Sequence, residues 1–368
     1  MKVALVHDYI KEYGGAERVL EALHEIYPDA PIYTSLYFPE FLGPHKSRFE
    51  KMDIRTSWMQ YIPFGYKLIS PLRLLSPFAF ESLNLSSYDV IITSQTGAYF
   101  PNLVRKGKGR LYSYTHTPPR YLYGYKTARD WKKNKVVAAL AEVANHVLRM
   151  IDFNASKNVD QFIANSQEVS SRIKKFYRQD AVVIYPPVEI STQSISHKSQ
   201  KKQPYYVAGG RLARAKGMDV IVDAFIKNKK PLKIFGKGFA GFEEELKSKI
   251  IHHASNIEFV GEVSDEEKLT LMAGAQAYIF ASYDEDFGIT PVEAMSVGTP
   301  VIAYKSGGVQ ETVVDGKTGL FYTPNTPDAL NNMLVKFEKI KISSHDCIQQ
   351  AQKFSTHEFS KKIQNAVK

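Results

Sequence analysis

Two glutamates and two cations in the second half of the chain have the types and spacing needed to bind an activated sugar. Glu285 follows the apolar segment 277–281, and Glu293 lies eight residues further on, near the start of an expected helix. Arg211 and Lys216 follow another apolar segment upstream. A guanidinium offers phosphate oxygens a planar fork, whereas an ammonium acts as a point charge. Together with carboxylates for sugar hydroxyls, these groups predict sugar-transfer chemistry.

The residues after Glu285 predict a helix with defined ends. Thr290 is expected as its cap, Pro291 as its first residue, and Glu293 as the third residue after the cap, as in a capping box. Gly298 is the expected terminator. A capping role would account for Glu293 without any ligand, but its second carboxylate oxygen could still accept hydrogen bonds from a ribose.

The acidic run around Glu285 has two interpretations. Asp284 and Asp286 flank it, and three consecutive acids repel one another unless a cation or a hydroxyl-rich ligand is near. The run could also be a metal-binding Asp-x-Asp. Because Arg211 and Lys216 already supply positive charge, we expect no metal.

Other donor contacts are expected at strand ends and helix starts. Gly14 and Gly15 separate the first strand from the first helix, where glycine would let a diphosphate approach, although a plain tight turn explains them equally well. Gly236 and Val263 follow further strands and could border a base. The remaining expected contacts are the backbone N–H groups of Phe287, Gly288 and Ile289.

His116 directly follows the strand-like segment 110–115. A histidine at a strand end could donate to a sugar hydroxyl or steady the reacting centre, and a structural role is equally open.

The elements that must position these residues alternate between apolar strands and amphipathic helices, twice over. The strands lack strict two-residue alternation, which predicts parallel sheets buried on both faces. We therefore expect an α/β chain with two Rossmann-like domains whose sheets face a cleft, with ligands at the carboxyl ends of the strands. The expected strands are 3–6, 90–93, 110–115, 162–165, 182–187, 205–210, 232–236, 257–261, 277–281, 300–304 and 319–322.

The chain of 368 residues is too long for one ordinary core. The polar segment 188–203 is the expected linker. It separates an acceptor-binding domain, 1–187, from a nucleotide-sugar-binding domain, 204–349. The tail, 350–368, is expected to be a helix that crosses back over the first domain.

The charge distribution suggests an anionic partner. The net charge is +10, of which residues 1–185 carry +8 and residues 186–368 carry +2. The stretch 105–135 holds ten Lys or Arg, one acid and interleaved tyrosines. This composition suits single-stranded nucleic acid or an anionic membrane face. The apolar stretch 62–80 favours the membrane, and a solvated loop plus a buried helix remains open.

The single cysteine, Cys347, excludes an internal disulfide and fits a reducing compartment. The N-terminus has too short an apolar run for a signal peptide, and no stretch approaches the ~20 apolar residues of a membrane span. We expect a cytoplasmic protein, peripheral on the inner face of the membrane, with no nucleic acid partner.

Four motifs together resemble family 4 retaining glycosyltransferases of the GT-B fold, over nearly the whole chain. They are Glu285-x7-Glu293, Gly210-Arg211-Leu212 with Lys216-Gly217, the early Gly14-Gly15, and Asn165-Ser166 at a helix entry. The opening VHDYIKEYGGAERVLEAL and the segment YTHTPPRYLYG resemble WbaZ-type bacterial O-antigen mannosyltransferases, which use GDP-mannose.

The resemblance implies a role for each candidate residue. Arg211 and Lys216 would hold the diphosphate, Glu285 the hydroxyls of the donor sugar, and Glu293 the ribose. His116 would lie near the transferred sugar. Neither a side-chain base nor a metal cofactor is implied, since the leaving phosphate itself would take the acceptor proton.

The implied activity is metal-independent transfer of mannose from GDP-mannose to a lipid-linked saccharide in O-antigen synthesis. A UDP- or dTDP-sugar donor stays open. So do an inactive membrane-binding module on the same scaffold and a sugar-nucleotide epimerase of similar two-domain shape.

Overall fold

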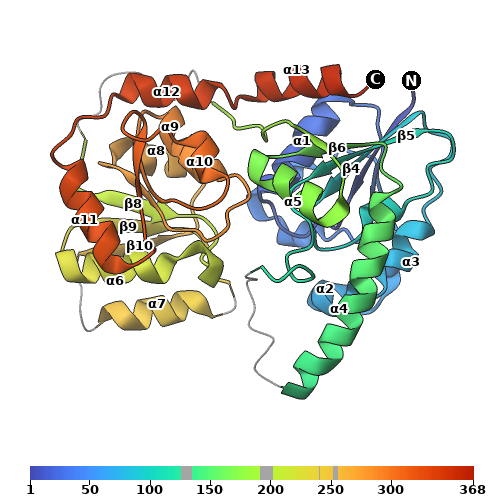
Figure 1. Cartoon of the computed structure of the whole chain (residues 1–368), viewed down its shortest axis with the longest axis horizontal. Coiled ribbons are helices and arrows are strands. Elements are labelled where there is room, and N and C mark those ends of the chain that lie inside the picture. The colour runs from blue at the N-terminus through green and yellow to red at the C-terminus, as the bar shows by residue number, and fades with distance from the viewer. Residues whose placement is uncertain (126–134, 191–201, 240, 252–255) are drawn as a thin grey trace. The chain divides into compact units, whose positions relative to one another are not determined.

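The structure is a computed structural model that describes residues 1–125, 135–190, 202–239, 241–251 and 256–368. The chain divides into two compact units (Figure 1). The first unit comprises residues 1–125, 135–187 and 356–368. The second comprises Val188–Ser355.

The first unit is built on a parallel sheet of seven strands in the order β3-β2-β1-β4-β5-β6-β7. The central strands are buried along almost their whole length, as their apolar composition predicts. The strands are β1 (Val3–His7), β2 (Ile32–Thr34), β3 (Ile54–Thr56), β4 (Val90–Gln95), β5 (Arg110–Thr115), β6 (Gln161–Ala164) and β7 (Ala181–Val183).

Helices cover both faces of this sheet. One buried cluster joins the strands to α1 and α13, and another joins them to α3 and α5. The α-helices are α1 (Gly15–Ile26), α2 (Ile69–Leu72), α3 (Ser76–Glu81), α4 (Lys135–Ser156), α5 (Gln167–Tyr177) and α13 (Thr356–Ala366). The 3-10 helices are η1 (Pro39–Phe41), η2 (Gly43–Arg48), η3 (Trp58–Tyr61), η4 (Gly65–Lys67) and η5 (Pro101–Leu103).

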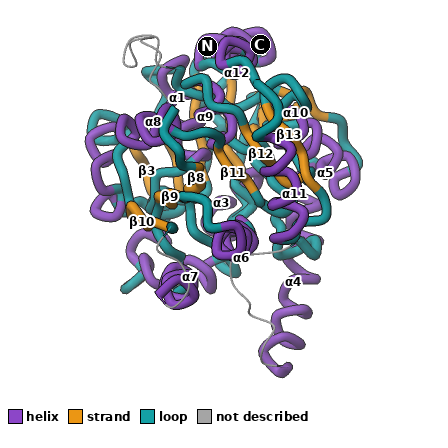
Figure 2. The backbone as a smooth tube through the Cα atoms, turned by 90° about the vertical axis from the view of Figure 1, so that its left-hand side faces the viewer, coloured by secondary structure: helices purple, strands orange, loops and turns teal. Residues whose placement is uncertain are grey.

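The second unit has a parallel sheet of six strands, which Figure 2 shows in their order β10-β9-β8-β11-β12-β13. They are β8 (Tyr206–Gly209), β9 (Leu232–Phe235), β10 (Ile257–Gly261), β11 (Tyr278–Phe280), β12 (Val301–Tyr304) and β13 (Gly319–Tyr322). The helices are α6 (Met218–Asn228), α7 (Phe242–Ile251), α8 (Asp265–Gly274), α9 (Ile289–Ser296), α10 (Val309–Thr312), α11 (Pro327–Phe337) and α12 (Ser344–Gln352), with η7 (Arg214–Lys216).

Cys347 lies on α12 and is fully buried. Its Sγ lies 3.7 Å from the carbonyl oxygen of Thr318, just before β13. Burial raises the pKa of the Cys347 thiol to about 12.

The two parallel sheets confirm the predicted α/β class, and every predicted strand is present. Strands β2 and β3 were not predicted. Each has only three residues, and they lie at one edge of the first sheet. Neither lies in an apolar run of five residues, whereas the equally short β7 and β11 do.

The tail differs in detail from the expected single helix. The segment 350–368 contains the end of α12, which belongs to the second unit, and all of α13, which belongs to the first. The break falls at Phe354, whose ring packs against Phe287 at 5.5 Å and whose carbonyl oxygen accepts from the N–H of Val188. Of the expected linker 188–203, residues 191–201 lie outside the described part of the chain.

Candidate active site

Two loops meet at the carboxyl edge of the second sheet. One follows β8 and the other follows β11. The N–H of Tyr283 donates to the carbonyl oxygen of Ala215 at 2.9 Å. Gly217 has a φ of 63°, and a Cβ there would collide with the carbonyl of Ala281. The close approach of the two loops therefore requires glycine.

This approach brings Lys216 to Glu285. The Nζ of Lys216 lies 2.6 Å from the Oε2 of Glu285, and the hydroxyl of Ser282 donates to the same oxygen. The Lys216 side chain is 37% exposed and the Glu285 side chain 13% exposed. The pair thus combines an anchored carboxylate with an ammonium that solvent and a ligand can reach.

Two further glycines, Gly307 and Gly308, contact the backbone of Glu285. The N–H of Gly308 donates to the carbonyl oxygen of Glu285 at 2.7 Å. Gly307 has a φ of 67°, and a Cβ there would collide with the backbone of Glu285. The sequence interpretation missed these two residues. The available signal was a Gly-Gly pair shortly after the strand at 300–304.

The loop after β8 presents cations with different surroundings. Arg211 opens the loop and is exposed, while Lys216 closes it. Arg214, between them, forms an ion pair with Glu245 of α7. Lys216, one of the two predicted cations, contacts Glu285.

Gly236 holds the start of that loop. It directly follows β9 with a φ of 119°, and a Cβ there would collide with the carbonyl of Gly210. The N–H of Leu212 donates to the carbonyl oxygen of Lys237 at 3.0 Å. Val263 follows β10 on the same edge and directly precedes Ser264, which forms a capping box with Glu267.

The predicted capping box at Glu293 is wrong. Helix α9 begins at Ile289, with Gly288 as its N-cap at a φ of 90°, so Thr290 lies inside the helix. Glycine reaches this left-handed conformation without strain, which lets the helix start earlier than the Thr-Pro pair indicates. Glu293 therefore lies in the second turn.

Glu293 is instead part of a buried ion pair. Its Oε1 lies 2.8 Å from the Nζ of Lys268 on α8, and both residues are buried. Lys268 also contacts Asp265 at 2.8 Å. Phe287 is buried as well, so only its backbone can face a ligand at the start of α9. The donor-binding roles of Phe287, Gly288, Ile289 and Glu293 remain predictions.

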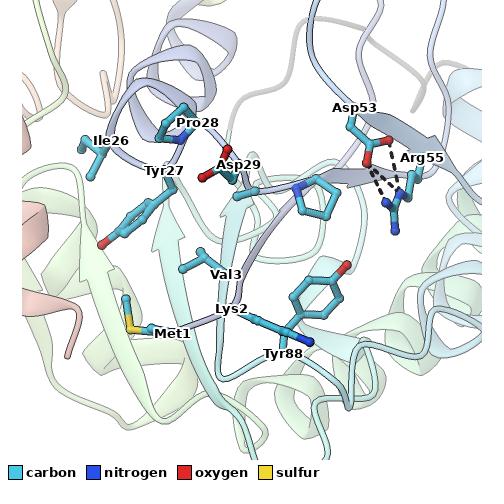
Figure 3. Close-up of a pocket in the computed structure, with 12 residues that line it drawn as sticks. Met1, Lys2, Val3, Ile26, Tyr27, Pro28, Asp29, Asp53, Arg55 and Tyr88 are labelled. Atoms are coloured by element: carbon cyan, nitrogen blue, oxygen red, sulfur yellow. Dashed lines mark hydrogen bonds and ion pairs between the residues drawn. The ribbon is translucent and has the colours of Figure 1, made fainter.

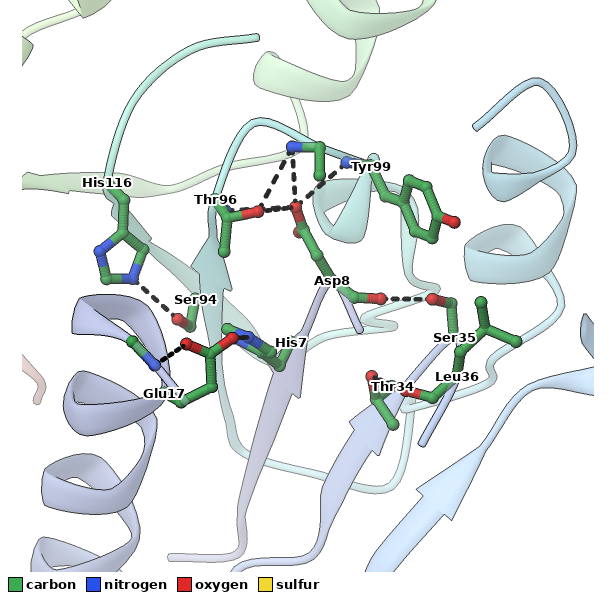
Figure 4. Close-up of polar contacts among 12 residues, drawn as sticks. His7, Asp8, Glu17, Thr34, Ser35, Leu36, Ser94, Thr96, Tyr99 and His116 are labelled. Atoms are coloured by element: carbon green, nitrogen blue, oxygen red, sulfur yellow. Dashed lines mark hydrogen bonds and ion pairs between the residues drawn. The ribbon is translucent and has the colours of Figure 1, made fainter. Parts of the chain in front are cut away.

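In the first unit, His116 follows β5 and its Nε2 lies 3.0 Å from the hydroxyl of Ser94 (Figure 4). Burial and the neighbouring His7 lower the pKa of His116 to about 3. The imidazole is therefore neutral near pH 7. It can donate or accept one hydrogen bond at each nitrogen, but it carries no charge.

The sequence interpretation also missed Asp8, the centre of the polar network in Figure 4. Its Oδ2 accepts from the hydroxyl of Thr96 at 2.5 Å and from the N–H groups of Ala98 at 3.0 Å and Tyr99 at 3.1 Å. Burial raises the pKa of Asp8 above its usual value. The residue pins the loop after β4 to the end of β1. An acid directly after an apolar strand was the signal.

Gly14 and Gly15 lie where a helix start was predicted. Gly14 is the N-cap of α1 in extended conformation, and its N–H donates to the Oε2 of Glu17 at 2.9 Å. The Oε1 of Glu17 lies 3.5 Å from the Nε2 of His7. The Glu17 carboxylate thus takes up the N–H of Gly14. The diphosphate contact at Gly14 and Gly15 stays a prediction.

A separate pocket of about 530 Å³ opens at the amino ends of β1, β2 and β3 (Figure 3). Its lining includes Lys2, Tyr27 and Asp29, and an ion pair of Arg55 with Asp53. Because His116 and Asp8 lie at the carboxyl ends of the same sheet, this pocket is not part of the candidate site.

The described residues hold neither a cluster of metal ligands nor a helix that could span a bilayer. No group of three or more His, Cys, Asp or Glu there is placed to hold a metal ion. Within the same residues, no helix is both long enough and apolar enough to span a bilayer. Of the basic stretch 105–135, residues 126–134 lie outside the described chain.

The chain is similar to known sugar transferases in sequence. Residues 189–354 match the family described as "Glycosyl transferases group 1". The alpha-1,3/1,6-mannosyltransferase ALG2 of Mus musculus is 25% identical over 365 residues, which cover 88% of this chain and 84% of that protein. The D-rhamnosyltransferase WbpZ of Pseudomonas aeruginosa is 28% identical over 196 residues, covering 48% of this chain and 49% of that protein.

The fold is also similar to that of solved structures. Anabaena HepE, solved in complex with UDP, superposes with a TM-score of 0.71 at 20% identity, covering 100% of this chain and 99% of that one. The lipopolysaccharide outer core galactosyltransferase WaaB superposes with a TM-score of 0.68 at 19% identity and the same coverage. These structures show that the chain has the GT-B fold. The sequence matches show that it is a glycosyltransferase. Curated mannosyltransferases are among its relatives.

Proposed function

We propose that this glycosyltransferase moves mannose from GDP-mannose to a lipid-linked saccharide, with retention of configuration and without a metal ion. The observation that carries the proposal is the contact of Lys216 with Glu285, on loops at the carboxyl edge of the unit that matches the glycosyltransferase family. The mannosyltransferase relatives support the choice of sugar.

In the proposed reaction, Lys216 and Arg211 neutralise the charge that grows on the departing diphosphate. An ammonium has three donors, so Lys216 can keep its contact with Glu285 while it binds a phosphate oxygen. Glu285 accepts from hydroxyls of the donor sugar, and Glu293 from the ribose. His116 of the first unit, as a neutral imidazole, hydrogen-bonds the transferred sugar. The leaving phosphate takes the acceptor proton.

The proposed acceptor is a lipid-linked saccharide at the membrane. Sequence similarity to ALG2 and WbpZ supports a saccharide acceptor, and the basic first half of the chain favours a lipid-linked one at the inner face of the cytoplasmic membrane. A role in O-antigen synthesis is the corresponding biological proposal.

A UDP-sugar is the second candidate donor, because structures of Anabaena HepE were solved with UDP and with UDP-glucose. A thermal-shift panel of GDP, UDP, dTDP and ADP separates the candidates. A nucleotide at about 100 times its Kd adds roughly 2.7 kcal/mol to the free energy of unfolding. GDP is expected to give the largest shift, and a larger shift with UDP would reassign the donor.

Two further measurements test the chemistry. Transfer is expected to persist in EDTA, and a strict requirement for Mn²⁺ would contradict the metal-free proposal. The anomeric configuration of the product, determined by NMR, is expected to match that of the donor. An inverted product would contradict retention.

A further inference from the structure

Four consecutive short helices of the first unit, η3, η4, α2 and α3, pack on one another and expose large apolar side chains. Tyr61 is 85% exposed, Phe64 67% and Phe78 62%. Large aromatic residues are normally covered in a soluble fold, and a contiguous apolar patch marks an interaction surface. We call this the apolar plate. Its exposed members are Trp58, Tyr61, Phe64, Leu68, Leu74, Leu75 and Phe78.

Buried side chains and hydrogen bonds anchor the helices of the plate to the first unit. Met59, Leu72 and Phe80 are buried in the core of the unit. The side-chain amide of Gln60 exchanges two hydrogen bonds with the backbone of Tyr37, at 2.8 and 3.0 Å. The segment therefore has apolar side chains on both its inner and its outer side, which a water-facing surface does not require.

The backbone conformation of Phe64 accompanies the exposure of its ring. Its φ of 57° and ψ of 24° lie in the left-handed region, which is unfavourable for a bulky side chain. Gly65, directly after it, packs against Phe38 and Leu36, so the turn itself is fixed. The fold thus tolerates strain at a residue whose ring gains nothing from the core.

The charge of the plate specifies the kind of partner. From Trp58 to Phe78, the span of the plate, the chain has two cations, Lys67 and Arg73, and no acid. Lys67 is exposed in the middle of the aromatic residues. Aromatic rings with interspersed cations suit the interface of a bilayer that carries anionic headgroups.

Helix α4 adds a second apolar strip. Val143, Val147 and Met150 are all exposed, and their spacing puts them on one face of the helix. Figures 1 and 2 both show α4 extending away from the sheet of the first unit. Both α3 and α4 pack on η5, so the strip and the plate belong to neighbouring elements.

We propose that the apolar plate docks on an anionic lipid bilayer, with Phe64 and Phe78 inserted among the acyl chains and Lys67 at the headgroups. The docking goes beyond the proposed sugar transfer. Only the purpose of the docking, which is to reach a lipid-linked acceptor, rests on the proposed function. Vesicle binding needs no sugar donor and no acceptor, so the two proposals can fail separately.

Trp58 provides a direct probe, because Trp131 is the only other tryptophan. In a Trp131→Phe variant of the full chain, emission is expected to shift to the blue on vesicles of phosphatidylcholine mixed with phosphatidylglycerol. Lipids brominated on their acyl chains are expected to quench it. Unchanged emission would overturn the proposal.

Three variants in this background test the named residues. Phe64→Gly removes the ring and relieves the left-handed strain, so it is expected to lower the vesicle partition coefficient about tenfold while thermal stability holds or rises. Phe78→Ser is expected to lower the partition coefficient by a similar factor. Lys67→Gln is expected to weaken binding roughly fivefold on anionic vesicles and not on pure phosphatidylcholine.

The matched control is Val335→Ser, an exposed apolar residue on α11 of the second unit. It is expected to leave vesicle binding unchanged. Equal binding by the control and by both phenylalanine variants would overturn the proposal. So would self-association in analytical ultracentrifugation that Phe64→Gly abolishes while vesicles bind nothing, since the plate would then join two copies of the chain.

Discussion

At the scale of single residues, the candidate site depends on one cation that is both anchored and accessible. Lys216 contacts Glu285 at 2.6 Å, whereas Arg214, two residues earlier, is engaged with Glu245 on the outside of the unit. The two side chains share a loop and a charge but differ in partner. They therefore form a natural test pair.

Lys216→Gln is expected to lower kcat/KM roughly 10²-fold, because a lost donor at a developing charge costs about that much. Arg214→Gln is expected to change kcat/KM by less than about threefold, since exposed ion pairs contribute little. Steady-state kinetics with both variants checks this. Equal losses would mean that the loop responds to charge in general and that Lys216 has no special role.

His116 carries a prediction about pH. Because burial and His7 lower its pKa to about 3, the imidazole stays neutral throughout the working range. A His116→Gln variant is expected to be slower by a factor that does not depend on pH, so the acid limbs of the two kcat/KM profiles coincide. A limb that moves in the variant would show that His116 ionises during the reaction.

At the scale of elements, the site is shaped by loops that only glycine can follow. Gly307 approaches the backbone of Glu285 so closely that a Cβ would collide with it, while Gly316, on the next loop, has open space around it. Both have positive φ, at 67° and 74°. The two positions thus share a backbone strain and differ only in crowding.

Gly307→Ala is expected to displace the Glu285 loop and to reduce donor binding at least tenfold. Gly316→Ala is expected to cost only the strain, about 1 kcal/mol of unfolding free energy, with donor binding retained. Calorimetric titration with the nucleotide and thermal unfolding separate the two effects. Retained donor binding in Gly307→Ala would remove Gly307 from the site.

The sequence predicted the long buried strands and the cation–carboxylate meeting at Lys216 and Glu285, because apolar runs and strand ends are local features. It failed where the outcome depends on distant partners. The start of α9 was misplaced because left-handed Gly288 competes with Thr290 as a cap, and the burial of Glu293 with Lys268 joins two helices. The pinning of the Thr96 loop by Asp8 joins residues 88 positions apart, which no local pattern reports.

At the scale of the whole molecule, the first unit is positively charged but contains buried acidic residues. Residues 1–185 carry +8, yet several acids of this unit are buried. Asp152 of α4 is one of them. It accepts from the hydroxyl of Tyr123 at 2.8 Å and of Tyr177 at 3.2 Å, and burial raises its pKa to about 7.

The folded state therefore binds a proton at Asp152 more tightly than the unfolded chain does. This contribution to stability is present below the unfolded pKa, near 3.8, and is lost as pH rises through about 7. As pH rises across that window, the free energy of unfolding of Asp152→Asn is expected to increase relative to that of the wild type. The increase is up to roughly 1.4 kcal/mol per pH unit. Urea unfolding at several pH values measures the difference. Parallel stability profiles would contradict the assignment.

The rate at which the buried thiol of Cys347 is chemically modified can measure local opening of the second unit. A maleimide or disulfide reagent needs a thiolate, and burial leaves almost none in the closed structure. Modification must wait until α12 lifts from the end of the second sheet, so its rate reports how often that region opens. Slower modification with a nucleotide present would show that a ligand bound elsewhere in the unit tightens the packing beneath α12.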